Sequence, residues 1–211
     1  MVFKKMLTNK QLKIFQIFAK QPFAKFERKQ IKQFTREKST NALSIALKQF
    51  LKEDVIKSSK VGKSYLYSLN LDNDLAYYYV ALVNSQRVDK NVKITISIIK
   101  DELDKITPFY CLVIFGSYAI QEQKKTSDLD IVIITEDEAK RKQIETALNT
   151  TKQKSLLPID PHVITKKELI EMLTNEEENL GKQIARKHLV LNNHDIFYKI
   201  IKNGIKHGFA I

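Results

Sequence analysis

The stretch FGSYAIQEQKKTSDLDI, residues 115–131, decides how the fold and chemistry of this chain are interpreted. It begins at the end of the apolar run YCLVIF, residues 110–115, which is typical of a strand buried on both faces. A Gly-Ser pair follows the run, and after ten more residues come Asp128 and Asp130. Side chains two apart on a strand point to one face. The stretch therefore predicts two carboxylates beside a turn whose amides can bind phosphate, as in a metal-nucleotide site.

Strand and helix patterns alternate through this part of the chain. We expect strands near 109–115, 128–135 and 159–165, and helices near 136–150, 166–174, 175–188 and 194–205. This order predicts an α/β (α+β) domain over 108–211, with a small mixed sheet and flanking helices. Residues 71–107 are expected to form a helical connector.

The positive charge is concentrated in the first third of the chain. Residues 1–70 contain 14 Lys and 2 Arg against 4 acidic residues, and this excess of 12 equals the net charge of the whole 211-residue chain. The remaining residues therefore balance to zero. Such asymmetry favours two modules, of which the first faces a polyanion.

The pattern of residues 1–70 predicts three helices followed by a β-hairpin. Apolar residues at helical spacing place the helices near 8–19, 27–34 and 41–53. The segment VIKSSKVGKSYLYSLN, residues 55–70, then has two strand patterns around a basic turn. This order resembles the winged helix-turn-helix domains of prokaryotic, particularly archaeal, regulators, so an α+β DNA-binding domain is expected over 1–70.

The resemblance implies a DNA-contacting face on the third helix and the hairpin. Residues expected to face bases are Asn41, Ser44 and Lys48, and those expected to face phosphate are Lys52, Lys60 and Lys63. Lys-rich faces are also common on ordinary solvated surfaces, and winged helices also serve as protein-interaction modules. Double-stranded DNA is the partner we expect, with these two alternatives open.

The segment from about residue 93 onward resembles the minimal nucleotidyltransferase domain of the DNA polymerase β superfamily. The resemblance rests on Phe115-Gly116-Ser117 and, ten residues later, on Asp128-Leu129-Asp130 preceded by Ser127. It implies that Gly116, Ser117 and Ser127 bind the nucleotide. It also implies that Asp128 and Asp130 are catalytic and bind Mg²⁺ in a two-metal site, with a nucleoside triphosphate, expected to be ATP, as substrate.

The same family uses a third carboxylate on a later strand, and Asp160 is the candidate for this catalytic and metal-binding role. Pro158 and Pro161 flank it, and proline in a strand indicates an edge or an irregular end. The sequence therefore leaves the placement of Asp160 open. His162 would share its face on a regular strand, and would otherwise be a strand-end surface histidine.

The remaining features limit the class of protein. No apolar run reaches the roughly 18 residues of a membrane span, and the N-terminus lacks the apolar stretch of a signal peptide. The single cysteine, Cys111, cannot form an internal disulfide. These observations favour the cytoplasm. The connector also suits a dimerisation arm, so a homodimer is a further expectation.

The leading interpretation is a Mg²⁺-dependent nucleotidyltransferase that moves a nucleoside monophosphate from a nucleoside triphosphate to a hydroxyl acceptor. The resemblance allows a protein acceptor such as a toxin. The alternative is a DNA-binding transcriptional regulator whose nucleotidyltransferase-like domain senses nucleotide without turnover. A third interpretation of Asp128 and Asp130 is a pair of strand-start carboxylates that bind no metal.

Overall fold

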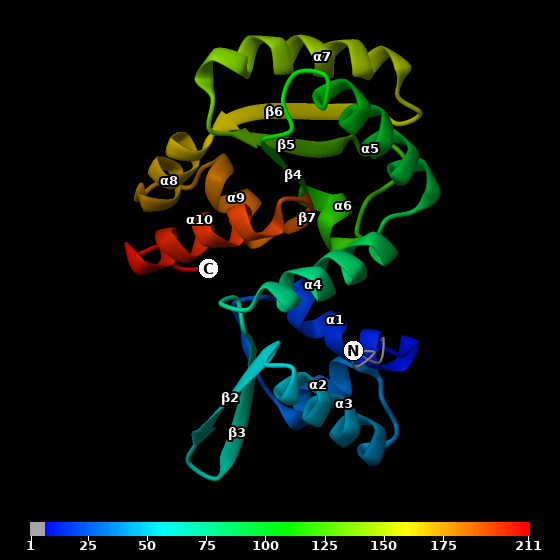
Figure 1. Cartoon of the computed structure of the whole chain (residues 1–211), viewed down its shortest axis with the longest axis vertical. Coiled ribbons are helices and arrows are strands. Elements are labelled where there is room, and N and C mark those ends of the chain that lie inside the picture. Colours follow the sequence, from blue (N-terminus) through cyan, green and yellow to red (C-terminus); the bar gives the residue numbers. More distant parts are fainter. Residues whose placement is uncertain (1–6) are drawn as a thin grey trace, which may run out of the picture. The chain divides into compact units, whose positions relative to one another are not determined.

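The computed structural model describes residues 7–211 and divides the chain into two compact units, which meet between Asn84 and Ser85 (Figure 1). The first unit contains a three-stranded antiparallel sheet of order β1-β3-β2 and its helices. Its elements are α1 (Asn9–Lys20), β1 (Lys25–Glu27), α2 (Arg28–Thr35), α3 (Thr40–Lys52), β2 (Ile56–Val61), β3 (Ser64–Leu69) and the start of α4 (Asp74–Arg87). Within residues 7–211 no helix is long and apolar enough to cross a membrane.

Side-chain caps set the beginnings of α1 and α3. The Thr8 hydroxyl accepts a hydrogen bond from the Gln11 amide at 3.2 Å, and Ser39 accepts one from the Ala42 amide at 3.1 Å. Each such cap is worth about 1 kcal/mol. The predicted helices and hairpin are confirmed to within a few residues. Strand β1, which pairs with β3, was not predicted because three residues are too few to show alternation.

The second unit is built on a four-stranded sheet of order β6-β5-β4-β7. Strands β5 and β6 are parallel and the other pairs antiparallel, so the predicted mixed sheet is confirmed. Its elements are α5 (Lys90–Leu103), β4 (Tyr110–Phe115), α6 (Gly116–Ile120), β5 (Leu129–Thr135), η1 (Glu138–Lys140), α7 (Arg141–Lys154), β6 (Ile159–Thr165), α8 (Lys166–Thr174), α9 (Leu180–Arg186), β7 (His188–Asn192) and α10 (His194–Lys206).

Strand alternation divides the side chains of the sheet between two helical layers. Alternate residues such as Ile114 on β4 and Ile131 on β5 pack in one core with Ile99 of α5 and Leu148 of α7. Helices α5 and α7 lie on this side of the sheet, and α8, α9 and α10 lie on the other (Figure 1). Asp130, next to Ile131 in the strand, therefore points to the opposite face from the α5–α7 core.

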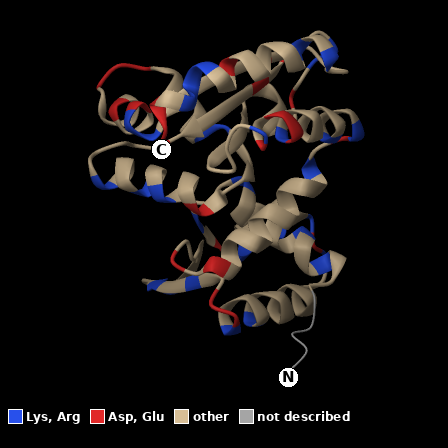
Figure 2. Ribbon diagram, turned by 45° about the horizontal axis from the view of Figure 1, so that its top comes forward, with Lys and Arg blue, Asp and Glu red and all other residues tan. Residues whose placement is uncertain are grey.

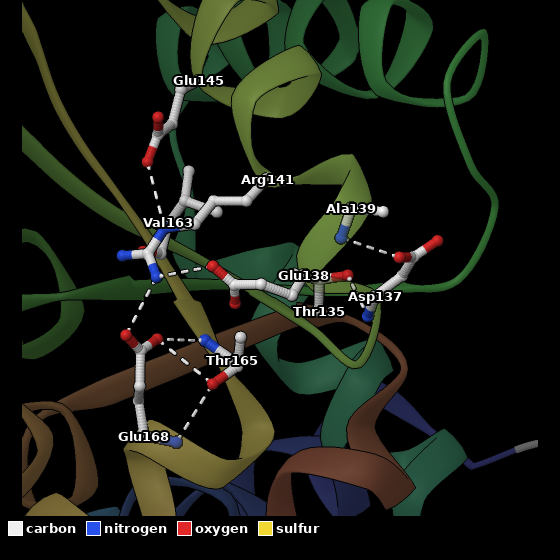
Figure 3. A network of polar contacts seen from close by, with 9 residues as sticks. All are labelled: Thr135, Asp137, Glu138, Ala139, Arg141, Glu145, Val163, Thr165 and Glu168. Carbon is white, nitrogen blue, oxygen red and sulfur yellow. Dashed lines mark hydrogen bonds and ion pairs between the residues drawn. The ribbon is translucent and has the colours of Figure 1, made fainter.

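Arg141, the first residue of α7, joins α7 to β6 and α8 (Figure 3). Its Nη1 lies 2.9 Å from Glu168 and 3.3 Å from Glu138, and its Nε lies 3.2 Å from Glu145. Nη2 donates to the carbonyl oxygen of Val163 at 3.1 Å. These charge-assisted contacts fix the carboxyl-terminal end of β6.

We expect two histidines, the buried His188 and the half-buried His194, to make the stability of the second unit depend on pH. Burial is the main cause that lowers the pKa of both His188 and His194 to about 4. The Nδ1 of His188 lies 2.9 Å from the Ala185 carbonyl oxygen, and its Nε2 has no hydrogen-bond partner among residues 7–211. Both rings thus stay neutral in the folded chain at pH values where the unfolded chain protonates them.

Because the folded pKa is the lower one, this stability is complete above about pH 6.5 and is lost as the pH falls toward 4. Between pH 7 and pH 5 each histidine should lower the free energy of unfolding by about 2 kcal/mol. Urea unfolding of the full chain at both pH values measures the loss. His188→Leu should reduce it by about half, whereas replacement of the exposed His207 should leave it unchanged. Equal stability of the wild type at both pH values would contradict the prediction.

Candidate functional site

Strand β4 ends directly in the Gly-Ser turn. Phe115 closes the strand, and Gly116 opens α6 with φ +66°, in the left-handed region that favours glycine. A Cβ placed on Gly116 would overlap Oδ2 of Asp130 and lie 3.2 Å from its Cγ. The turn therefore brings the backbone of Gly116 into direct contact with the Asp130 side chain.

The predicted carboxylates meet at the amino-terminal ends of β5 and β6. Parallel pairing places Asp130 directly opposite Asp160, and Asp128 comes one residue before β5. Burial raises the pKa of the half-buried Asp130 carboxyl, and the charges of Asp160 and Asp128 raise it further, while His162 opposes the change. The negative charges of Asp128, Asp130 and Asp160 therefore lie close enough to interact with one another.

Strand β6 is regular in spite of Pro161, and Pro158 lies just before it. The strand lies at the edge of the sheet, where a missing amide removes no bond to a further strand. Pro161 stays in register with Ile131. Asp160 and His162 consequently share a face, with His162 Nε2 3.2 Å from Asp160 Oδ2. The His162 ring also packs against Phe115, with centroids 5.7 Å apart.

The donor set suits a hard divalent cation. Carboxylate oxygens are the ligands that Mg²⁺ prefers, and Mg²⁺ usually combines one or two carboxylates with substrate phosphates and water. Burial, and after it the negative charges of Asp160 and Asp128, raises the pKa of Asp130, and a bound cation would favour the ionised carboxylate. Within residues 7–211, no three His, Cys, Asp or Glu side chains form a ready set of metal ligands. Asp128, Asp130 and Asp160 would therefore share a cation with phosphate or water oxygens.

The two predicted nucleotide-binding serines have different surroundings. Ser117 is half-buried in the first turn of α6, and its carbonyl oxygen accepts a hydrogen bond from the Glu122 amide at 2.9 Å. The Ser127 hydroxyl accepts one from the Lys124 amide at 2.9 Å, which closes a turn in the loop before β5. Ser127 thus orders the loop that leads to Asp128.

A cavity of about 440 Å³ opens beside the Gly-Ser turn. Its lining comes from two separate segments: Gly116, Ser117, Ile120 and Glu122 at one side, and Gln183, Arg186 and Lys187 in and after α9 at the other. The α9 side offers the Gln183 amide and two cations, Lys187 and Arg186, although Arg186 Nη1 already pairs with Glu178 at 2.7 Å. All three side chains can donate hydrogen bonds to phosphate. These three residues were not predicted, because α9 lies about fifty residues after Asp128 and Asp130 and carries no motif.

Arg87 supports α6 and was also missed. Its Nη2 donates to the carbonyl oxygen of Ala119, and the Gln121 side chain donates back to the Arg87 carbonyl oxygen at 3.3 Å. Burial lowers the pKa of the Arg87 guanidinium, which remains charged at neutral pH. A cation at the carboxyl end of α6 complements its exposed carbonyls. Arg87 thus holds the helix that follows Gly116.

In the first unit, five of the six residues predicted to contact DNA are exposed: Asn41, Lys48, Lys52, Lys60 and Lys63. Ser44 is half-buried. Its hydroxyl accepts a hydrogen bond from Arg28 Nη2 and donates one to the Thr40 carbonyl oxygen at 2.9 Å. The Ser44 hydroxyl is therefore engaged in hydrogen bonds within the protein. Charges of both signs are distributed over the helices of the second unit (Figure 2).

Comparison with known proteins bears on the second unit. No curated protein and no solved structure matches the chain. A family model described as the nucleotidyltransferase domain matches residues 96–191, a range that includes the Gly-Ser turn, the aspartates and α9. The part of the chain that contains the candidate site is therefore similar to nucleotidyltransferase domains.

Proposed function

We propose that the second unit transfers a nucleoside monophosphate from a nucleoside triphosphate, with ATP as the expected donor, to a hydroxyl acceptor. The observation that carries this proposal is the contact between Gly116 and Asp130, with Asp160 beside Asp130. In this arrangement, the turn that we propose as the phosphate site lies against a pair of carboxylates. The match to the nucleotidyltransferase domain supports the general activity.

Each group has a role that follows from its chemistry. The amides at the Gly116 turn and the Ser117 hydroxyl would donate to the triphosphate oxygens. Arg186 and Lys187, across the cavity, would neutralise the same phosphates. Asp128, Asp130 and Asp160 would hold Mg²⁺, which supplies charge neutralisation and a lowered pKa of the bound hydroxyl.

In this proposal Asp160 receives the acceptor's proton. It is exposed, and His162 lies 3.2 Å from its Oδ2, so the two side chains orient one another. The acceptor oxygen forms a bond to the α-phosphorus while the bond from that phosphorus to the pyrophosphate oxygen breaks. The acceptor proton passes to Asp160, and pyrophosphate leaves with the bonding electron pair.

Transfer of label from α-³²P nucleoside triphosphates tests the proposal. The full chain is incubated with each of the four triphosphates and Mg²⁺, with total cell protein and total RNA as acceptor probes. Labelled acceptor together with pyrophosphate is the expected product. A chain that binds nucleotide in equilibrium dialysis but labels no acceptor would instead support the second candidate, nucleotide sensing by a DNA-binding regulator.

We propose further that the first unit binds duplex DNA as a winged helix-turn-helix. Support comes from the order α1-β1-α2-α3-β2-β3, from the exposed lysines of α3 and the hairpin, and from the excess positive charge of residues 1–70. Counterion release then predicts a slope of log K against log salt of about −0.9 for each phosphate contact. A homodimer and a protein acceptor are the other partners that we propose.

We expect Lys60→Gln with Lys63→Gln to reduce that slope by about two and to weaken binding at low salt. Fluorescence anisotropy of a labelled random duplex over a salt series measures both quantities. Lys142→Gln with Lys152→Gln, two exposed positions on α7, is the matched control and should leave the slope unchanged. A slope near zero for the wild type would refute DNA binding.

A further inference from the structure

We propose that Ile45 reads the 5-methyl group of thymine in the major groove, an inference that rests on the proposed DNA binding of the first unit. Helix α3 presents one line of exposed side chains: Asn41, Ile45, Lys48 and Lys52. Their spacing of i, i+4, i+7 and i+11 places them in a single stripe along the helix. Ile45 is the apolar member of that stripe.

Ile45 does not contribute to the buried core face of α3. The core face of the helix is filled by Leu43, Leu47 and Phe50, which are buried, whereas Ile45 is 55% exposed. It borders a hollow of about 310 Å³, lined by residues of α1 and α3. The apolar surface of Ile45 is thus left open to solvent, and its removal from water by a ligand would be favourable.

Neighbouring polar groups of α3 are already engaged, which distinguishes Ile45 from Ser44. Arg28 binds the Ser44 hydroxyl and donates to the Thr40 carbonyl oxygen at 3.0 Å, and Lys32 Nζ donates to the Thr40 hydroxyl at 2.8 Å. Ser44 therefore has its hydrogen bonds within the protein. Ile45 lies between Asn41 and Lys48 on the stripe, and its side chain, unlike that of Ser44, is available to contact a ligand.

The charge around Ile45 selects the occupant. The sequence of α3, TNALSIALKQFLK, contains no acidic residue, and Lys48 and Lys52 continue the stripe. Arg28 and Lys32 add positive charge next to its beginning. A polyanion that also offers a small apolar group fits this combination. The thymine 5-methyl, at the floor of the major groove between two phosphate backbones, is such a group.

The test compares thymine with deoxyuridine, which pairs identically but lacks the methyl group. A preferred duplex is first selected from a random library with the wild-type chain. Each thymine of that duplex is then replaced singly by deoxyuridine, and affinities are measured for wild type, Ile45→Ala and the control Ile205→Ala. One replacement should weaken wild-type and Ile205→Ala binding about fourfold, the worth of one buried methyl group. It should leave Ile45→Ala binding unchanged.

The outcomes separate this inference from DNA binding itself. If wild type and Ile45→Ala respond equally to every replacement, Ile45 does not read the methyl group. If both chains in that case still show the same steep slope of log K against log salt, the proposal of DNA binding stands. A selection that yields no thymine preference would also overturn the role. If no duplex binds, both proposals fail. Capture of an acidic protein by Ile45 without any base preference would likewise refute the methyl contact.

Discussion

Gly116→Ala should abolish nucleotide transfer, whereas Gly62→Ala should leave it intact. Both glycines have a positive φ, +66° at Gly116 and +58° at Gly62, so alanine pays the same backbone cost of roughly 1–2 kcal/mol at either position. The surroundings differ. A Cβ on Gly62 meets nothing within 4 Å, but a Cβ on Gly116 overlaps the carboxylate of Asp130.

The difference between the two variants therefore isolates the contact with Asp130. In Gly116→Ala either the turn or the carboxylate must shift, and a displacement of about 1 Å at a reacting centre costs on the order of 100-fold in rate. We expect at least that loss, with a free energy of unfolding lower than that of Gly62→Ala by about 1–3 kcal/mol. Urea unfolding and transfer of α-labelled nucleotide measure the two effects. Full activity in Gly116→Ala would show that this contact is not part of the site.

Asp130→Asn should remove transfer without weakening the fold. Asparagine has nearly the same shape but carries no charge, so the variant loses a metal ligand, and we expect a loss of at least about 1,000-fold. Because the folded-state pKa of Asp130 is raised, its ionised form is disfavoured in the native structure. The variant should thus be as stable as the wild type at pH 7, or more stable.

The pH dependence gives this prediction a second, independent readout. The penalty of ionised Asp130 exists above its folded pKa and disappears as the pH falls through it. Any stability advantage of Asp130→Asn should therefore shrink in acid. Asp137→Ala is the matched control, because Asp137 lies beyond the carboxyl-terminal end of β5, whereas Asp130 lies at its amino-terminal end. The Asp137 carboxylate caps η1 by accepting a hydrogen bond from the Ala139 amide at 2.9 Å. It should lower stability by about 1 kcal/mol and retain transfer. Retained transfer in Asp130→Asn together with lost transfer in Asp137→Ala would contradict the assignment of Asp130 as a metal ligand.

Most of the secondary structure could be predicted because it depends on local patterns. The all-apolar run of β4 and the helical spacing of apolar residues in α1 and α3 are visible in the sequence, and the structure confirms these elements. Strand β7 (His188–Asn192) was not predicted: the helix expected at 175–188 overlaps it only at His188, and no element was expected over 189–193. Its five residues, HLVLN, are enclosed by helical patterns, and only pairing with β4 makes them a strand.

The candidate site was predictable only where its residues lie in one motif. Gly116, Asp128 and Asp130 are recognisable by spacing, but Arg186 and Lys187 reach the cavity through the folding of α9 and have no signal of their own. Likewise, no pattern could show that Arg28 would occupy the Ser44 hydroxyl, since that contact joins two helices. Propensity and periodicity describe neighbours along the chain, and these residues are neighbours only in space.

The position of β6 at the edge of the sheet affects whether another molecule can pair with it. An outermost strand normally offers a row of free amides and carbonyls, to which a strand of another molecule can add. Pro161 interrupts that row because it has no amide hydrogen, and the exposed charge of Asp160 stands next to it. The residues that made this strand difficult to interpret from sequence thus discourage edge-to-edge aggregation. They allow a carboxylate to remain open to solvent on a strand that no other chain can readily extend.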